Sequence, residues 1–452
     1  MNSRSFALTA ALILSSLCGF GAPRLKIAYF QADVTPSVGI PVAYAPTRSI
    51  VDSLSARGVV ISPEGQKPIV LCVVDWLLIS NESSDLFRNY LAKAAGTTPD
   101  RVSVHTVHQH DTPWCDQSSE KALAANGLGG IRFDLQFLDG CMRRTAEALA
   151  RALPKSKEVK KVGFGEAKVE KVASNRRILG PDGKVRIVRF SSSRDSAAIQ
   201  APEGLIDPFL KSVSFWDGSG KPIVVLNYYA THPQSYYGQG DVNPEFIGMA
   251  RNARHNKSGI PQLFFIGAAG NIAAGKYNNG SPEMRQVLAD RIEKALDEAF
   301  ENTVQQPAPE KISWQVAPLR LPLAGFMVAD SLKNQLADTS KDFNTRFAAA
   351  RQLAWLERNK RNAPVVVTSL QLGGIRLLQL PGEPFIEYQL AAQQYRPGEK
   401  VCTAAYGDGG MVYIGTSVAY SQGGYEVDRR VNATNEKAEA VLTRAIRDVM
   451  KP

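Results

Sequence analysis

Residues 68–78 read Pro-Ile-Val-Leu-Cys-Val-Val-Asp-Trp-Leu-Leu, and the six residues after the proline are all apolar. A run of this length and composition is typical of a strand buried on both faces of a sheet. Residues 84–95, which follow, suit a helix, and residues 101–107 are again rich in β-forming side chains. This alternation of strand and helix patterns predicts an α/β fold.

The alternation continues along the chain. Further strands are predicted at 26–30, at 210–230 as a hairpin around Asp217-Gly218-Ser219-Gly220, at 262–266, and at 365–380 around Gly373-Gly374. Helices are predicted at 133–153, 282–300, 329–359 and 435–449. No linker rich in Pro, Gly or Ser divides the chain, and no repeat with a period of about 20 to 50 residues is found. We therefore expect one domain over residues 23–452.

Residues 1–22 have the layout of a secretory signal peptide. A short positive start, Asn2-Ser3-Arg4, precedes an apolar run at 6–17 and small residues at 19–22. The alternative, a membrane anchor, is less favoured because the run is short, and no later stretch could span a membrane. We expect an exported protein, periplasmic or secreted, with no transmembrane segment after cleavage.

Cysteine and charge add weaker expectations. Four mature cysteines without CxxC spacing could form one disulfide or remain buried thiols: Cys72, Cys115, Cys141 and Cys402. The net charge of +10 is spread along the chain. It favours an anionic substrate or surface over a nucleic-acid partner. We expect a small-molecule or lipid substrate and no nucleic acid, and the sequence gives no oligomeric state.

The chain has only five histidines, and three of them, His105, His108 and His110, follow one predicted strand. If the alternation of a strand continues, His108 and His110 lie on one face and His105 on the other. Such a pair can present two imidazoles to one zinc ion. Histidines without a metal are the open alternative.

Two further residues could complete a zinc site. His232 follows a predicted strand at the start of a loop, and Glu383 lies in the rigid turn Pro381-Gly382-Glu383-Pro384. A zinc hydrolase usually has about three protein ligands and one open position. His105 is expected in the core or behind a ligand, and His255 on an exposed helix. Asp75 is either a partner of a histidine ligand or a strand-end acid.

Seven short motifs then occur in one order: Ala32-Asp33-Val34-Thr35-Pro36, His108-Gln109-His110, Asn175-Arg176, Ala230-Thr231-His232-Pro233, Gly270-Asn271, Pro381-Gly382-Glu383 and Tyr413-Ile414-Gly415-Thr416. Together they resemble the catalytic domain of neutral/alkaline non-lysosomal ceramidases, and still more the shorter bacterial ceramidase-like relatives. The resemblance runs from about residue 25 to about residue 427. It implies layered mixed β-sheets flanked by helices, and zinc-dependent hydrolysis of a sphingolipid-type amide.

The resemblance also implies roles for individual residues. The zinc ligands of the family fall on His108, His232, Glu383 and Tyr413. His110 matches a family position beside the metal, where it would contact the substrate or move protons. Arg176 matches the position of a substrate-binding arginine in the family. A second family tyrosine, twelve residues after the metal tyrosine, matches Tyr425.

The chain departs from the family in three places. It has Asp111-Thr112-Pro113 where ceramidases have Ser-Gly-Pro, and Ala273 where they have a serine. It also ends at residue 452, so no C-terminal β-sandwich domain is expected.

The expected mechanism uses zinc-bound hydroxide to attack an amide carbonyl. Backbone N–H groups at Gly270 and Asn271 would face the substrate, and Asp111 would act as an acid–base group or cap a loop. Two alternatives stay open. One is a zinc esterase or other hydrolase on the same site, and the other is a non-catalytic envelope-binding protein that keeps the fold.

Overall fold

The computed structural model describes residues 24–451, so the predicted signal peptide at 1–22 lies outside the described residues. Within residues 24–451, no helix is both long enough and apolar enough to cross a membrane. The α/β prediction is confirmed, because helices alternate with strands in several mixed sheets.

The first sheet has the strand order β6-β4-β3-β1-β8. Its strands are β1 (Leu25–Asp33), β3 (Ser55–Pro63), β4 (Ile69–Val74), β6 (Val102–Thr106) and β8 (Lys157–Val159). β1, β3 and β4 pair antiparallel, whereas β6 lies parallel to β4 and is reached through helix α1 (Asn81–Ala95). Helix α3 (Leu135–Ala152) then packs against β1.

The second sheet repeats this arrangement in the order β16-β14-β13-β9-β18. Its strands are β9 (Lys161–Lys168), β13 (Phe209–Trp216), β14 (Pro222–Tyr229), β16 (Gln262–Ile266) and β18 (Val304–Pro307). Here α5 (Glu245–Ser258) leads from β14 to the parallel strand β16, and α6 (Glu283–Glu301) packs against β9 and β13.

The third sheet has four strands in the order β19-β20-β21-β23. They are β19 (Ile312–Leu319), β20 (Val365–Leu372), β21 (Ile375–Gln379) and β23 (Lys400–Ala404). Helix α9 (Ile386–Tyr395) leads to the parallel strand β23, and α11 (Ala438–Val449) packs against β19 and β20.

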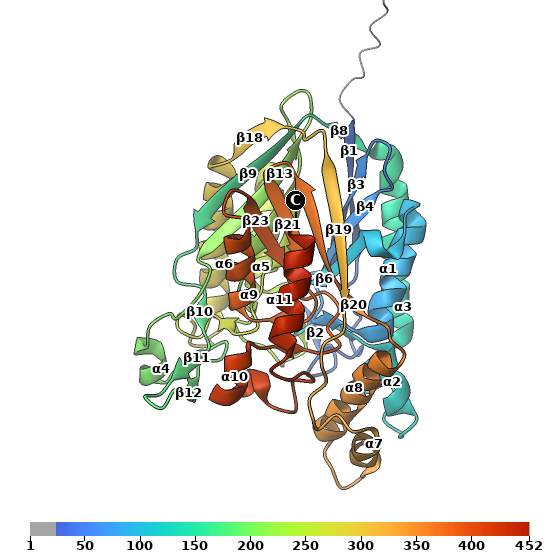
Figure 1. Cartoon of the computed structure of the whole chain (residues 1–452), viewed down its shortest axis with the longest axis vertical. Helices are drawn as coiled ribbons and strands as arrows, with labels where there is room; N and C mark the ends of the chain where they lie inside the picture. Colours follow the sequence, from blue (N-terminus) through green and yellow to red (C-terminus); the bar gives the residue numbers. More distant parts are fainter. Residues whose placement is uncertain (1–23, 452) are drawn as a thin grey trace, which may run out of the picture.

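The fold therefore contains one unit three times. Each unit has three antiparallel strands, a crossover helix, a fourth strand parallel to the third, and a closing helix. Figure 1 shows the three helix pairs, α1 with α3, α5 with α6 and α9 with α11, on different sides of the sheets. The last strands of the units, β6, β16 and β23, lie together, because β16 contacts both of the others.

The remaining elements are short and lie in the connections. Their bounds are β2 (Ser49–Ile50), β5 (Leu78–Ile79), β7 (Trp114–Cys115), β10 (Ser174–Asn175), β11 (Arg177–Leu179), β12 (Val185–Val188), β15 (Asp241–Val242), β17 (Ile272–Ala273), β22 (Glu383–Pro384), β24 (Tyr413–Ile414), α2 (Gln117–Ala124), α4 (Ser196–Gln200), α7 (Ala329–Ala337), α8 (Phe343–Lys360), α10 (Ser417–Gln422), and 3-10 turns at Pro99–Arg101, Leu153–Lys155 and Tyr425–Val427.

The single helix predicted at 329–359 is wrong: the segment forms the hairpin of α7 and α8. Its break lies at two aspartates, whose side chains compete with the helix for backbone N–H groups. The Asp338 carboxylate accepts from the backbone N of Ser340, and the Asp342 carboxylate caps α8 by accepting from the backbone N of Thr345. The hairpin lies at the end of the molecule away from β18 (Figure 1).

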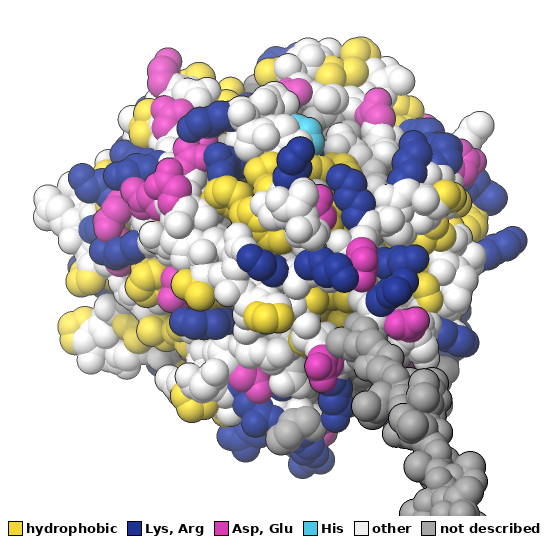
Figure 2. All heavy atoms as spheres, turned by 90° about the horizontal axis from the view of Figure 1, so that it is seen from above, with side chains coloured by type: hydrophobic (Ala, Val, Ile, Leu, Met, Phe, Trp, Pro, Cys, Tyr) yellow, Lys and Arg dark blue, Asp and Glu magenta, His cyan; other side chains and the backbone are white. Residues whose placement is uncertain are grey.

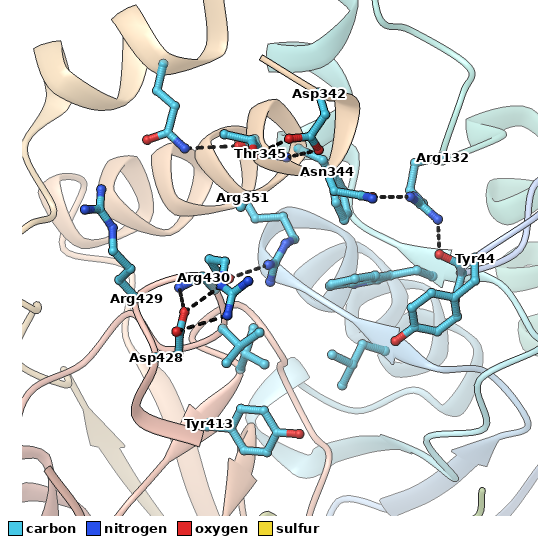
Figure 3. Close-up of a pocket in the computed structure, with 18 of the residues that line it drawn as sticks. Tyr44, Arg132, Asp342, Asn344, Thr345, Arg351, Tyr413, Asp428, Arg429 and Arg430 are labelled. Carbon is cyan, nitrogen blue, oxygen red and sulfur yellow. Dashed lines mark hydrogen bonds and ion pairs between the residues drawn. The ribbon is translucent and has the colours of Figure 1, made fainter. Parts of the chain in front are cut away.

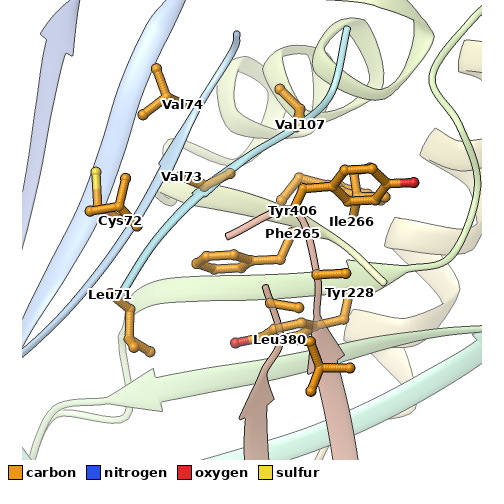
Figure 4. Close-up of a cluster of buried hydrophobic side chains, with 14 of the residues drawn as sticks. Leu71, Cys72, Val73, Val74, Val107, Tyr228, Phe265, Ile266, Leu380 and Tyr406 are labelled. Atoms are coloured by element: carbon orange, nitrogen blue, oxygen red, sulfur yellow. The ribbon is translucent and has the colours of Figure 1, made fainter. Parts of the chain in front are cut away.

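Apolar side chains fill the junction of the three sheets (Figure 4). Leu71 and Val73 come from the first sheet, Phe265 from the second and Leu380 from the end of the third. Within residues 24–451, the four cysteines are buried free thiols, and no disulfide joins any two of them. On the face seen in Figure 2, basic side chains are interspersed with acidic and uncharged ones, as the dispersed charge of the sequence predicts.

Candidate metal centre

His108, His232 and Glu383 meet at one point, and each comes from a different unit of the fold. His108 follows β6, His232 follows β14, and Glu383 follows β21. One candidate ligand atom from each lies within 4.8 Å of the other two. Glu383 Oε2 is 3.2 Å from His108 Nε2 and 3.3 Å from His232 Nε2. All three side chains are buried.

The local backbone at His108 differs from the predicted strand alternation. The strand ends at Thr106, and His108 adopts a positive φ of 62° while its backbone N–H donates to the Trp76 carbonyl. The turn still brings the rings of His108 and His110 to 4.8 Å from each other. His105 lies in the core, as expected, where its Nδ1 is 2.6 Å from the Ala405 carbonyl oxygen.

Hydrogen bonds orient both histidines of this cluster. Nδ1 of His108 lies 3.0 Å from the Leu77 carbonyl, and Nδ1 of His232 lies 2.9 Å from the Ile272 carbonyl. A carbonyl only accepts, so each Nδ1 carries the proton and each Nε2 keeps a lone pair directed at Glu383. His232 Nε2 and Glu383 Oε2 are buried and have no hydrogen-bond partner in the part of the chain that the structure describes. This donor set fits a metal ion, which would satisfy both atoms.

Electrostatics hold His232 and Glu383 in the forms that bind a metal. Burial lowers the pKa of His232 to about 4, which keeps the imidazole neutral. Burial alone would raise the pKa of Glu383, but contact with His108 and His232 outweighs burial and lowers this pKa below its ordinary value, so the carboxylate stays charged. Metal ligands must be deprotonated in this way.

Tyr413 lies beside Glu383 because their short strands, β24 and β22, pair in parallel with these two residues in register. Its hydroxyl is 3.4 Å from both terminal nitrogens of Arg176. Burial raises the pKa of Tyr413 well above its ordinary value, although Arg176 acts in the opposite direction.

The guanidinium of Arg176 is buried and held by protein. It contacts the Glu426 carboxylate at 3.0 Å and packs against the rings of Tyr413 and Tyr425, each 5.5 Å away. Arg176 is absent from the cavity wall formed by residues 24–451. These contacts indicate a residue that positions Tyr413, and the substrate contact that the resemblance implies stays a prediction.

A cavity of about 1100 Å³ opens beside the cluster. Its floor includes the predicted site residues His108, His110, Glu383, Tyr413 and Tyr425. His110 stacks on Tyr44, with ring centroids 5.7 Å apart. Burial lowers the pKa of His110 well below its ordinary value, and His108 and His232 lower it further. The opposite wall is built by α8 and the loop before α3.

Gly270 and Asn271 hold the glutamate turn in place. The Gly270 N–H donates to the Pro384 carbonyl at 2.9 Å, so it is not free for a substrate. Asn271 Oδ1 accepts from the backbone N of Ile386 at 2.9 Å, at the start of α9. Neither residue is part of the described cavity wall. These contacts support the turn that carries Glu383, and a substrate contact of the Asn271 backbone N–H stays a prediction.

Asp111 and Asp75 also have structural contacts. Asp111 Oδ1 accepts hydrogen bonds from the backbone N–H groups of Gly238 and Gly240. These bonds correspond to the second of the two roles considered for Asp111, the capping of a loop. Asp75 pairs with Arg251 at 2.6 Å and accepts from Ser55, so it is a strand-end acid rather than a partner of His108 or His232. His255 is partly exposed on α5.

Sequence reasoning missed the arginines of the cavity. Arg132 precedes α3, and Arg351 lies on α8, inside the segment that we predicted as one long helix. No local motif distinguishes either from the other arginines of the chain, since only the tertiary fold brings them to the cavity.

Comparison with known proteins gives a fold relationship. No protein-family model and no curated protein matches the chain. Among solved structures, it is similar to neutral ceramidase from Pseudomonas aeruginosa, with a TM-score of 0.70 and 16% identity, over 95% of this chain and 74% of that chain. A structure of a ceramidase complexed with C2 matches with the same TM-score and identity, over 95% of this chain and 75% of that one. The chain thus has the fold of ceramidases, which confirms at the level of the fold the resemblance seen in its motifs.

Proposed function

We propose that this protein is a zinc-dependent hydrolase that cleaves an N-acyl amide bond. The observation that carries the proposal is the convergence of His108, His232 and Glu383 beside a cavity whose wall includes His108 and Glu383. Two of their buried polar atoms lack a hydrogen-bond partner. A cluster of this kind is costly to bury unless an ion satisfies it.

His108, His232 and Glu383 would hold the metal, with Tyr413 as the fourth ligand. Two imidazole nitrogens and one carboxylate oxygen are a set that zinc accepts in catalytic sites. When bound, zinc supplies Lewis acidity, which polarises a carbonyl and lowers the pKa of water. Arg176 fixes the Tyr413 oxygen and favours negative charge on it.

His110 is the proposed proton carrier. Its Nδ1 lies 3.0 Å from the His108 carbonyl, so Nδ1 carries the proton and Nε2 is left as the basic atom. A neutral imidazole on the cavity wall can take a proton from the attacking water and give it to the leaving nitrogen. Tyr425, which also lines the cavity and packs edge-on against Tyr413 at 5.9 Å, would contact the substrate.

We further propose that the enzyme works outside the cytoplasm as one domain, after removal of residues 1–22. The composition of that segment supports export. Apolar side chains on the cavity wall, including Leu77, Val412 and Val431, suit an acyl chain. The ceramidase fold supports an amide as the scissile bond.

Metal analysis combined with turnover tests the proposal. The purified protein should contain one zinc per chain and hydrolyse at least one of a panel of N-acyl amides. His108→Ala, His232→Ala and Glu383→Ala should lose both properties, whereas His255→Gln, a histidine outside the site, should keep both.

Other outcomes would contradict specific parts of the proposal. Turnover of esters alone would favour the esterase alternative. Zinc binding without turnover of amides or esters would favour a binding protein. A folded protein that takes up no zinc would refute the metal centre itself.

A further inference from the structure

Arg132 and Arg351 face the cavity and have no acidic partner among residues 24–451. Arg132 donates to the Ala43 carbonyl and, at 3.3 Å, to Asn344 Oδ1. Arg351 donates to the Arg430 carbonyl at 3.0 Å. All of these acceptors are neutral, and Nε of each arginine is buried without any hydrogen-bond partner. Arg132 is only 9% exposed.

Aromatic rings cover the faces of both guanidiniums. Phe347 lies between them: its ring centroid is 5.0 Å from the guanidinium carbon of Arg132 and 5.2 Å from that of Arg351. Trp114 lies 5.0 Å from Arg351, and Phe343 lies 5.2 Å from Arg132. Stacking of this kind fixes the plane of a guanidinium and leaves its N–H edges for a ligand, but it does not neutralise the charge.

The acids of the cavity wall are engaged elsewhere. Asp428 pairs with Arg430 at 2.9 Å, Asp342 caps α8, and Asp338 accepts from Ser340. Glu383 belongs to the metal cluster. Burial lowers the pKa of Arg132 and of Arg351, which reflects the cost of enclosing their charges. An anionic ligand would offset that cost through charge-assisted hydrogen bonds.

Figure 3 shows where such a ligand would lie. Arg351 extends from α8 toward the side of the cavity on which Tyr413 lies, and Arg132 lies beside Tyr44. Both arginines therefore line the same cavity as His108 and Glu383 of the metal cluster.

We propose that Arg132 and Arg351 bind an oxyanion of the substrate, so that the preferred substrate is an N-acyl compound with a carboxylate, sulfonate or phosphate group. This inference rests on the proposed hydrolase function, because it names the substrate class of that site. A neutral amide such as a ceramide leaves both guanidiniums without a counter-charge.

A matched substrate pair tests the inference. N-lauroylglycine and N-lauroylethanolamine share the acyl chain and the amide, but only the first carries a carboxylate. We expect kcat/KM to be at least about 10-fold higher for N-lauroylglycine than for N-lauroylethanolamine. This ratio is the effect expected from one hydrogen bond to a charged group. Arg351→Met should remove most of that preference, with less than about a threefold change for N-lauroylethanolamine.

Arg143→Met is the control. Arg143 stacks on Tyr90 at 4.9 Å, much as Arg351 stacks on Trp114, but it is exposed and is not part of the described cavity wall. The control should keep the wild-type preference. N-lauroyltaurine, which carries a sulfonate, extends the comparison. If the wild type prefers it to N-lauroylethanolamine and Arg351→Met does not, the inference is supported and a sulfonate is an accepted oxyanion.

The outcomes separate this inference from the proposed function. Equal hydrolysis of N-lauroylglycine and N-lauroylethanolamine would overturn the inference and leave the hydrolase intact. If neither compound is hydrolysed, the affinity for N-lauroylglycine is measured by calorimetry for the wild type and for Arg351→Met. A loss of affinity of about 10-fold in the variant supports the anion site. An unchanged affinity refutes it.

Discussion

Replacing Gly270 by alanine should disturb the metal centre although no ligand residue is replaced. A Cβ on Gly270 would lie 3.0 Å from the Pro384 carbonyl oxygen, 3.1 Å from the Glu383 carbonyl carbon, and closer still to the Glu383 carbonyl oxygen. Ordinary contact begins at 3.4 Å, so the turn that carries Glu383 must move by at least 0.4 Å. Zinc–ligand distances tolerate about 0.2 Å. We expect zinc affinity to fall about 10- to 100-fold, the range for lost support of a ligand.

The assay is a zinc competition titration against a chromophoric chelator, with thermal unfolding measured in parallel. Overpacking should also lower the free energy of unfolding by about 1 to 3 kcal/mol. Gly398→Ala is the matched control, because a Cβ there meets no atom within 4 Å. Wild-type zinc affinity in a folded Gly270→Ala protein would refute the view that this close approach sets the position of Glu383.

Three further predictions concern single side chains. Tyr413→Phe keeps the ring but loses the hydroxyl that contacts Arg176. Zinc affinity and kcat should each fall at least about 10-fold, with little change in melting temperature. Unchanged zinc affinity and kcat would show that Tyr413 is not a ligand. Ala273→Ser should change kcat less than about threefold, because Ala273 is fully buried and lies outside the described cavity wall; a gain of several orders of magnitude would instead identify serine as the nucleophile. Burial lowers the pKa of His105 from 6.5 to about 4. The unfolded chain therefore binds more protons between these values, and the free energy of unfolding should drop by about 3 kcal/mol as the pH falls through that window. Urea unfolding of His105→Gln should show a shallower pH dependence, and an unchanged slope would count against this assignment.

Much of the fold could be predicted from local patterns. The apolar run at 68–78 became β4, and the hairpin signal at Asp217-Gly218 became the turn between β13 and β14. The predicted strand at 262–266 matches β16. The error at 329–359 has a local cause, because the helical spacing continues while Asp338 and Asp342 interrupt it through side-chain hydrogen bonds.

The candidate site was predicted less completely, because residue identity does not reveal orientation. His108, His232 and Glu383 were chosen as residues that follow strands, and the structure brings them together. The role of Arg176 was inferred from the resemblance, and that of Asn271 from an expected backbone N–H group, and neither argument reveals which part of the protein the side chain contacts. Their partners, Glu426 and Ile386, lie more than 100 residues away along the chain.

The threefold unit explains why ligands so far apart in sequence meet. In each unit the third and fourth strands are parallel, so their carboxyl ends lie at the same edge, where α/β sheets usually place their sites. The units join along their fourth strands: the Ala405 N–H donates to the Ile266 carbonyl, and the Thr106 N–H donates to the Tyr406 carbonyl. These bonds bring the three strand-end edges to one point, and each unit then needs to supply only one ligand: His108, His232 or Glu383. Strand ends that meet in this way require the units to share only their strand order, so each unit can carry a different ligand in a different local sequence.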